Sequence, residues 1–240
     1  MFEHSGLYNI GYWRGPDGAR LTGIADACHR LVTRHLEVDE TPREAISTIL
    51  DIGCGLGATT ARFAAAHPDA TTIGVNYSEA QVARAVRTDA ASGASFVAMD
   101  ATQLGIASGS VDRIHSIEAA VHFAPRTAFF AEAARVLRPG GRMIISDILP
   151  RAPSDVVPPD NVVTEIADYV AAARANGLEA VHVEDITGET LAPFVAEMQR
   201  RKLANIGRTF EAMVAHYVLC VFERPGRALS PSAARPPAAR

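Results

Sequence analysis

Apolar and polar positions alternate along the chain in a way that predicts short buried strands separated by amphipathic helices. Seven apolar runs predict strands, at residues 49–52, 70–75, 95–99, 111–117, 142–146, 179–183 and 217–222. Apolar residues spaced three and four apart predict helices at residues 21–36, 59–66, 129–137, 162–176 and 191–204, and Ser78 is a candidate N-cap for a further helix. Alternating strands and helices predict an α/β fold.

The turn after the first strand is the most informative stretch of the chain. Residues 48–58 read TILDIGCGLGA, with three glycines at alternate positions that let the backbone turn where side chains would clash. A strand, a glycine loop and a helix form the entry to a nucleotide-type site in an open α/β sheet. Gly53, Gly55 and Ala58 also fit the loose dinucleotide fingerprint, so the glycines alone do not decide the ligand.

Asp51 changes this picture because it stands at the strand end, two residues before the first glycine. A carboxylate there would repel a pyrophosphate and attract a cation, and S-adenosylmethionine carries both an ammonium and a sulfonium. Residues 50–57 closely resemble motif I of the class I methyltransferases that use this cofactor. The resemblance implies that its amino-acid end is held by five residues: Asp51, Gly53, Cys54, Gly55 and Gly57. A solvated Asp beside a helix cap is the structural alternative.

Three later segments extend the resemblance in the correct order, so that it covers residues 46–149. The run NYSEAQ at residues 76–81 is similar to the second cofactor segment, a strand at 95–99 delivers Asp100, and residues 134–141 read ARVLRPGG. The family implies further cofactor contacts at Asn76, Tyr77, Gln81, Asp100, Ala101 and Ile117. Asn76 would face the ribose where relatives usually carry an acid, and Asp100 the adenine amino group; both could instead serve only in turns.

Three segments outside this core have predicted roles. Residues 7–13, LYNIGYW, resemble the aromatic N-terminal lid of small-molecule methyltransferases, which implies a cofactor contact for Tyr12, although simple packing of the arm is the alternative. The lid and helix span residues 1–45, and the loop and helix at 150–178 are predicted to roof the substrate pocket. Residues 1–223 then form one methyltransferase domain, and residues 224–240, with four prolines and four arginines, are predicted to be a disordered tail.

Candidate catalytic residues follow the strand at 111–117, at the sheet edge where substrate should meet cofactor. Residues 118–122, EAAVH, are similar to a segment of sugar and natural-product O-methyltransferases in which a final His takes the proton from the acceptor hydroxyl. This resemblance and the near-neutral pKa of imidazole predict His122 as general base, with Asp147 as its orienting partner. Val121 departs from the second His that those enzymes often carry, and Glu118 is the alternative base.

The composition and net charge of the chain limit the kinds of molecule that it is expected to bind. A net charge of -4 provides no bulk attraction for nucleic acid or an anionic membrane, and no apolar run approaches the roughly 20 residues of a membrane span. Three scattered cysteines suggest neither disulfides nor zinc, which fits a cytoplasmic protein. No metal is implied, because Asp147 is followed by Ile148 and not by a second oxygen ligand. A small-molecule substrate is expected, and a homodimer is left open.

The resemblance implies a Rossmann-like, seven-stranded mixed sheet with helices on both faces and a small helical lid. It predicts an S-adenosylmethionine-dependent methyltransferase, with O-methylation in secondary metabolism as the expected reaction. Alternatives are a C- or N-methyltransferase, a cyclase-like natural-product enzyme on the same fold, and a regulatory module that only binds the cofactor. Asp51 and the later motifs argue against a nicotinamide-dependent reductase.

Overall fold

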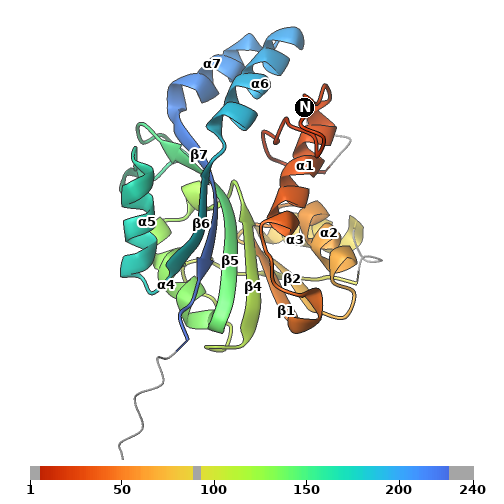
Figure 1. Ribbon diagram of the computed structural model, residues 1–240, viewed down its shortest axis with the longest axis vertical. Helices are drawn as coiled ribbons and strands as arrows, with labels where there is room; N and C mark the ends of the chain where they lie inside the picture. The colour runs from red at the N-terminus through yellow and green to blue at the C-terminus, as the bar shows by residue number, and fades with distance from the viewer. Residues whose placement is uncertain (1–5, 89–92, 227–240) are drawn as a thin grey trace, which may run out of the picture.

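One seven-stranded sheet organises the computed structural model, which describes residues 6–88 and 93–226 (Figure 1). The strands are β1 (Thr48–Ile52), β2 (Thr71–Asn76), β3 (Ser95–Ala98), β4 (Val111–Ile117), β5 (Leu137–Pro150), β6 (Glu179–Asp185) and β7 (Val214–Glu223). Their order is β3-β2-β1-β4-β5-β7-β6. The first five are parallel, whereas β7 runs antiparallel between β5 and β6. The predicted mixed sheet is therefore confirmed.

Helices cover both faces of the sheet because its central strands are apolar on both sides. On one face lie α1 (Ile24–Glu37) and α2 (Ala58–Ala66), and α3 (Glu79–Thr88) runs beside β2 and β3; on the other lie α4 (Arg126–Val136) and α5 (Ile166–Ala175) (Figure 1). Strand β5 shows the alternation: Ile144 packs with the α1 and α2 side, and Ile145 with the α4 and α5 side. Successive side chains of β5 thus belong to different cores.

A helical pair rises from the edge of the sheet where the parallel strands end. It consists of α6 (Thr187–Arg200) and α7 (Ala204–Met213), joined by a tight turn in which Lys202 has φ 61° (Figure 1). The rings of Phe194 and Phe210 meet edge-on, with centroids 5.0 Å apart, and hold the pair together. The sequence pattern predicted a single helix at 191–204 and missed α7.

Helix α5 was predicted to be part of a lid over the substrate pocket, but it packs against the sheet and α4. Its Tyr169 and Ala173 are buried, and Tyr169 packs edge-on against Phe130 of α4 with ring centroids 5.4 Å apart. This helix therefore supports the sheet. Of the predicted tail, residues 224–226 continue from β7, where the Arg224 amide donates to the carbonyl oxygen of Gly141 at 2.9 Å. Residues 227–240 lie outside the described part of the chain.

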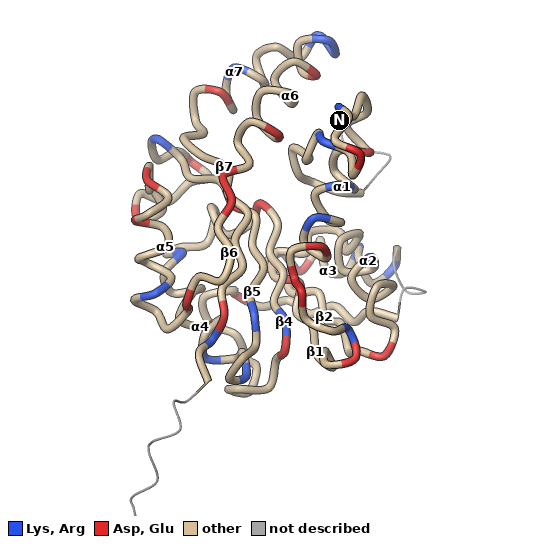
Figure 2. Tube along the Cα trace, in the orientation of Figure 1, with Lys and Arg blue, Asp and Glu red and all other residues tan. Residues whose placement is uncertain are grey.

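Charged residues are interspersed along the chain. Figure 2 shows acidic and basic positions alternating over helices and strand ends, with no long run of one sign along the described trace. This distribution fits the small net charge of -4. None of the helices in residues 6–88 and 93–226 is both long and apolar enough to cross a membrane.

Two histidines are buried between α1, α2 and the sheet. His115 of β4 stacks on Phe63 of α2 with ring centroids 4.0 Å apart, and His35 of α1 lies 5.7 Å from His115 by the same measure. Burial lowers the pKa of His115 to about 3, and the nearby positive charges of His67 and Arg113 act in the same direction. The folded protein therefore holds this imidazole neutral well below the ordinary pKa.

We expect this burial to make the fold sensitive to acid. The unfolded chain protonates His115 near pH 6.5 and the folded chain near pH 3, so stability present above pH 6.5 is lost as the pH falls toward 3. His115→Phe keeps the stacking and removes the proton site. When the pH falls from 7 to 5, wild type should therefore lose about 2 kcal/mol more of its unfolding free energy than this variant does. Urea unfolding at both pH values measures this; parallel pH dependences would contradict it.

Candidate active site

A cavity of about 790 Å³ lies at the edge of the sheet where the parallel strands end. Its wall comes from the ends of β1, β2 and β4, from the N-terminal segment and from α7. The carboxyl ends of parallel strands converge at one edge, so residues distant in sequence become neighbours there. Eight predicted cofactor residues line this cavity: Gly53, Gly55, Asn76, Tyr77, Gln81, Asp100, Ala101 and Ile117.

The glycine loop forms the floor of the cavity. Gly53 has φ 81° and lies so close to Ala119 that any side chain would collide with it. Gly55 has φ 55°, and an added Cβ would meet no atom within 4 Å. Gly53 is thus required for packing, whereas Gly55 leaves its backbone open to a ligand. Gly57 is the N-cap of α2 with φ 92° and does not line the cavity, so its role is to start the helix.

Asp51 sits behind this loop, in a small cavity of about 40 Å³ that it shares with Cys54, Asn9 and Gly55. Its side chain is only 1% exposed, and the hydroxyls of Thr59 and Thr60 donate to Oδ2 at 2.6 and 2.7 Å. Burial raises the pKa of Asp51 to about 6, against the effect of both hydroxyls. A cationic group placed beside this desolvated carboxylate would stabilise its charged form.

Polar side chains that could bind another part of a ligand follow β2 and β3. The Asn76 side-chain amide donates to Gln81 Oε1 at 2.7 Å, so both side chains are held at the cavity wall. Asp100 accepts two bonds from Thr102 on Oδ1, at 2.7 and 2.8 Å. These bonds match the alternative prediction, in which Asp100 only stabilises a turn, but Asp100 also lines the cavity. Tyr77 is 80% exposed at the rim.

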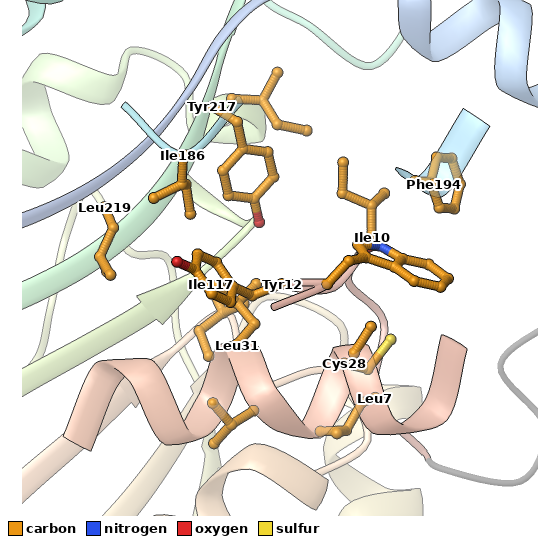
Figure 3. Close-up of a cluster of buried hydrophobic side chains, with 14 of the residues drawn as sticks. Leu7, Ile10, Tyr12, Cys28, Leu31, Ile117, Ile186, Phe194, Tyr217 and Leu219 are labelled. Atoms are coloured by element: carbon orange, nitrogen blue, oxygen red, sulfur yellow. The ribbon is translucent and has the colours of Figure 1, made fainter. Parts of the chain in front are cut away.

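Tyr12 lies away from the cavity, contrary to its predicted cofactor contact. It is buried among apolar side chains such as Leu31 and Leu219 (Figure 3), and the guanidinium of Arg34 lies 5.5 Å from the centre of its ring. The aromatic residue of the N-terminal arm that does line the cavity is Tyr8, together with Asn9 and Ile10. The alternative of simple packing thus describes Tyr12.

Glu118 occupies the inner wall of the cavity, directly after β4. Its backbone has φ 51°, a left-handed conformation that is costly for a residue with a side chain. Oε1 accepts from the Ile10 amide at 2.7 Å and from the Tyr217 hydroxyl at 2.5 Å. Burial raises the pKa of Glu118 to about 7, and the charge of Asp147 adds to this shift. A carboxylate with this pKa can accept a proton at neutral pH.

His122 lines the same cavity at its exposed margin. Its Nδ1 lies 2.6 Å from the carbonyl oxygen of Val156, and since a carbonyl only accepts, Nδ1 carries a proton in this bond. Asp147 makes no hydrogen bond to His122. Its buried side chain pairs with Arg126 at 3.0 Å and accepts from Tyr169 Oη at 3.1 Å. Burial raises the pKa of Asp147, and the charges of Arg126 and His122 oppose this shift.

Sequence reasoning missed several residues of the site. Phe210 lines the cavity from α7, and Tyr217 reaches Glu118 from β7, more than 90 residues further along the chain. Neither stands in a recognisable motif, since Tyr217 belongs to an apolar strand and α7 was not predicted. In residues 6–88 and 93–226, no three His, Cys, Asp or Glu side chains gather as ligands for a metal ion.

Comparisons with known proteins place this geometry in context. A family model described as a methyltransferase domain matches residues 50–145. The methyltransferase GfsG of Streptomyces halstedii is 33% identical over 197 residues, which cover 76% of this chain and 69% of that protein. An O-methyltransferase of Pyrenophora dematioidea is 37% identical over 150 residues, 60% of this chain, which spans only 54% of that relative.

Solved structures share the fold. The cyclase SpnF superimposes with a TM-score of 0.72 over 92% of this chain and 88% of that one. Because the two sequences are only 20% identical, this likeness concerns the fold alone.

Gly55 offers a direct test of the predicted cofactor contact. We expect Gly55→Ala to weaken S-adenosylmethionine binding by about 10-fold or more, roughly 1.4 kcal/mol, because the methyl group occupies space that the ligand needs. Gly140→Ala is the matched control, since Gly140 also has a positive φ, 77°, and open space around its Cβ, but lies at the start of β5. Calorimetry should find wild-type affinity in the control. Equal affinity in both variants would contradict the assignment.

Proposed function

The chain belongs to the class I S-adenosylmethionine-dependent methyltransferases, and from this membership we propose that it methylates a hydroxyl group of a neutral small molecule. One observation carries the choice of a neutral substrate: among the described residues that line the cavity there is neither a Lys nor an Arg. A phosphate or carboxylate on the substrate would therefore be buried without a cationic partner, which is costly.

The residues of the inner cavity fit the cofactor that this family uses. The open backbone at Gly55 leaves room for the ligand, and the desolvated Asp51 is suited to its ammonium group. Asn76, Gln81 and Asp100 would bind its hydroxyl and amino groups. When bound, S-adenosylmethionine supplies an electrophilic methyl group on a sulfonium.

The acceptor half of the cavity is mainly apolar. Five side chains from the N-terminal arm, the segment after β4 and α7 form it: Ile10, Ala119, Phe123, Ala124 and Phe210. Such a wall favours an apolar molecule with few polar groups. The Pyrenophora dematioidea relative is named an O-methyltransferase, which supports oxygen as the acceptor atom. A cavity of about 790 Å³ has room for cofactor and acceptor together.

We propose Glu118 as the group that takes the proton from the acceptor hydroxyl, in place of His122. Glu118 lies on the inner wall and has a pKa of about 7, whereas His122 stands at the exposed margin and has no hydrogen bond to Asp147, which pairs with Arg126. The other ring nitrogen of His122, Nε2, is then a binding group for the acceptor. The Glu118 carboxylate would take the proton of the acceptor hydroxyl as the methyl group leaves the donor sulfur for the hydroxyl oxygen.

The experiment for the reaction itself uses a panel of neutral hydroxylated natural products with S-adenosylmethionine. We expect S-adenosylhomocysteine to form with some of them, and matched phosphorylated or carboxylated analogues to be poor substrates, because the cavity holds no Lys or Arg among its described residues. Products identified by mass spectrometry should carry the methyl group on oxygen. Conversion of a substrate without consumption of the donor would instead support a cyclase-like enzyme.

Variants at residues 118 and 122 test the assignment of the base. Glu118→Gln should lower kcat by roughly 10²- to 10⁴-fold, with donor affinity little changed. His122→Gln should act mainly on the acceptor KM. In wild type, kcat/KM should rise with pH through about 7, because only the ionised Glu118 accepts a proton, and this limb should vanish in Glu118→Gln. A large loss of kcat only in His122→Gln would return the proton transfer to His122.

A further inference from the structure

The side chain of Asn9, in the N-terminal arm, is buried with one hydrogen-bond donor unused. Asn9 is 1% exposed, and its Oδ1 accepts from the Gly11 amide at 3.0 Å. A backbone amide only donates, so this bond identifies the oxygen of the side chain and leaves Nδ2 as the donor. Within residues 6–88 and 93–226, Nδ2 has no hydrogen-bond partner. A buried donor without a partner costs free energy, which is tolerated where a ligand takes the bond.

Asn9 stands where the two cavities of the site adjoin. It lines the large cavity and also the small one of about 40 Å³, which it shares with Asp51, Gly55 and Thr59. A water molecule needs roughly 10–15 Å³ by this measure, so the small cavity has room for a few groups of that size. The small cavity thus combines an acid and an amide donor around a space that suits small polar groups.

The amino-acid end of S-adenosylmethionine has two such groups, an ammonium and a carboxylate on the same carbon atom. Groups this close together need partners of opposite character within one small space. The desolvated Asp51 suits the ammonium, because a nearby cation stabilises its charged form. The carboxylate needs a hydrogen-bond donor beside it, and Nδ2 of Asn9 is a donor in the same cavity.

The other described side chains of the small cavity are poorer donors for a carboxylate. Neither a Lys nor an Arg is among them. The hydroxyl of Thr59 has a single proton, which it donates to Asp51 Oδ2 at 2.6 Å. The thiol of Cys54 is a weak donor, and Tyr8 is 56% exposed, so water competes for its hydroxyl.

A neutral amide is sufficient for this carboxylate, although an anionic acceptor would lack a partner in the cavity. S-adenosylmethionine brings its own ammonium and sulfonium, which compensate the negative charge within the ligand. An acceptor with a phosphate or a carboxylate has no such internal cation. The absence of Lys and Arg from the described cavity wall therefore disfavours an anionic acceptor and permits the donor.

The arm holds Asn9 in place on both sides of its side chain. The Asn9 carbonyl oxygen accepts from Cys28 Sγ of α1 at 3.0 Å, and the following amide, that of Ile10, donates to Glu118 Oε1 at 2.7 Å. Gly11 has φ 80° and packs on α1, where an added Cβ would lie 2.6 Å from a side-chain carbon. These contacts fix the backbone around Asn9, so its amide is preorganised for a ligand.

We propose that Nδ2 of Asn9 donates to the carboxylate of S-adenosylmethionine, while Asp51 binds the ammonium of the same amino-acid end. The proposal rests on the cofactor within the proposed function and not on the identity of the acceptor. It makes the N-terminal arm a part of the donor site. Because the Ile10 amide donates to Glu118, the residue that holds the donor is followed directly by the one that contacts the proposed base.

The test compares two ligands that differ only in the carboxylate. Decarboxylated S-adenosylmethionine keeps the adenosine, the sulfonium and the amine. Asn9→Asp keeps the shape of the side chain and an acceptor for the Gly11 amide, but replaces Nδ2 by a carboxylate oxygen. In calorimetry on the full chain, this variant should bind S-adenosylmethionine about 10- to 100-fold more weakly than wild type, the scale of a lost bond to a charged group. It should bind the decarboxylated compound at least as tightly, because added negative charge attracts a cation.

Three further variants separate the carboxylate from other causes. Asn9→Ala removes the donor without adding charge, and should also weaken the binding of S-adenosylmethionine selectively. Asp51→Asn should weaken the binding of both ligands alike, because both carry the ammonium. Asn205→Asp adds the same charge as Asn9→Asp, but at an exposed position of α7 outside both cavities, and should change neither affinity.

The ratio of the two affinities is the readout, because the decarboxylated compound reports whether each variant keeps its site intact. If Asn9→Asp and Asn9→Ala leave this ratio at its wild-type value, Asn9 does not bind the carboxylate and the proposal fails. If wild type binds S-adenosylmethionine but methylates no hydroxyl, the proposed function fails alone, and the ratio still decides the role of Asn9. Absence of S-adenosylmethionine binding in wild type would overturn both.

Discussion

The hydrogen bonds to the carboxylate of Glu118 hold the cavity together. A buried acceptor must find donors, and Glu118 finds them in the Ile10 amide of the N-terminal arm and the Tyr217 hydroxyl of the last strand. These two donors are separated by more than 200 residues, yet both meet at the end of β4. The left-handed backbone at Glu118 is tolerated because the surrounding structure fixes it. Arm, sheet and cavity thus depend on one side chain.

The electrostatic character of the site is set by the acidic side chains in its wall. Three carboxyl groups, Asp51, Asp100 and Glu118, line the two adjoining cavities, and neither a Lys nor an Arg among the described residues lines either of them. A cationic donor is favoured in such an environment and an anionic acceptor is not. Burial keeps the pKa values of Asp51 and Glu118 high, so both carboxylates gain most from a nearby positive charge.

The alternation of β5 explains why two adjacent residues serve different purposes. Ser146 faces α1, where its Oγ lies 3.0 Å from His35 Nε2, whereas Asp147 faces α4 and pairs with Arg126. Because successive strand side chains point to opposite faces, Asp147 faces Arg126 and Tyr169, and its carboxylate bonds to these two side chains and not to His122. Its desolvated carboxylate stabilises the α4 side of the sheet, together with Tyr169.

The sequence by itself determined the sheet, the glycine loop and the set of residues that follow β1 to β4. These features are local: apolar runs specify strands, and a motif such as LDIGCGLG carries its turn and its acid together. Only the tertiary structure decided that Tyr8 and not Tyr12 lines the cavity, that α7 closes it, and that Tyr217 contacts Glu118. Those contacts depend on strand pairing and on the path of the N-terminal arm, which bring together residues far apart in the chain and leave no periodic signal in it.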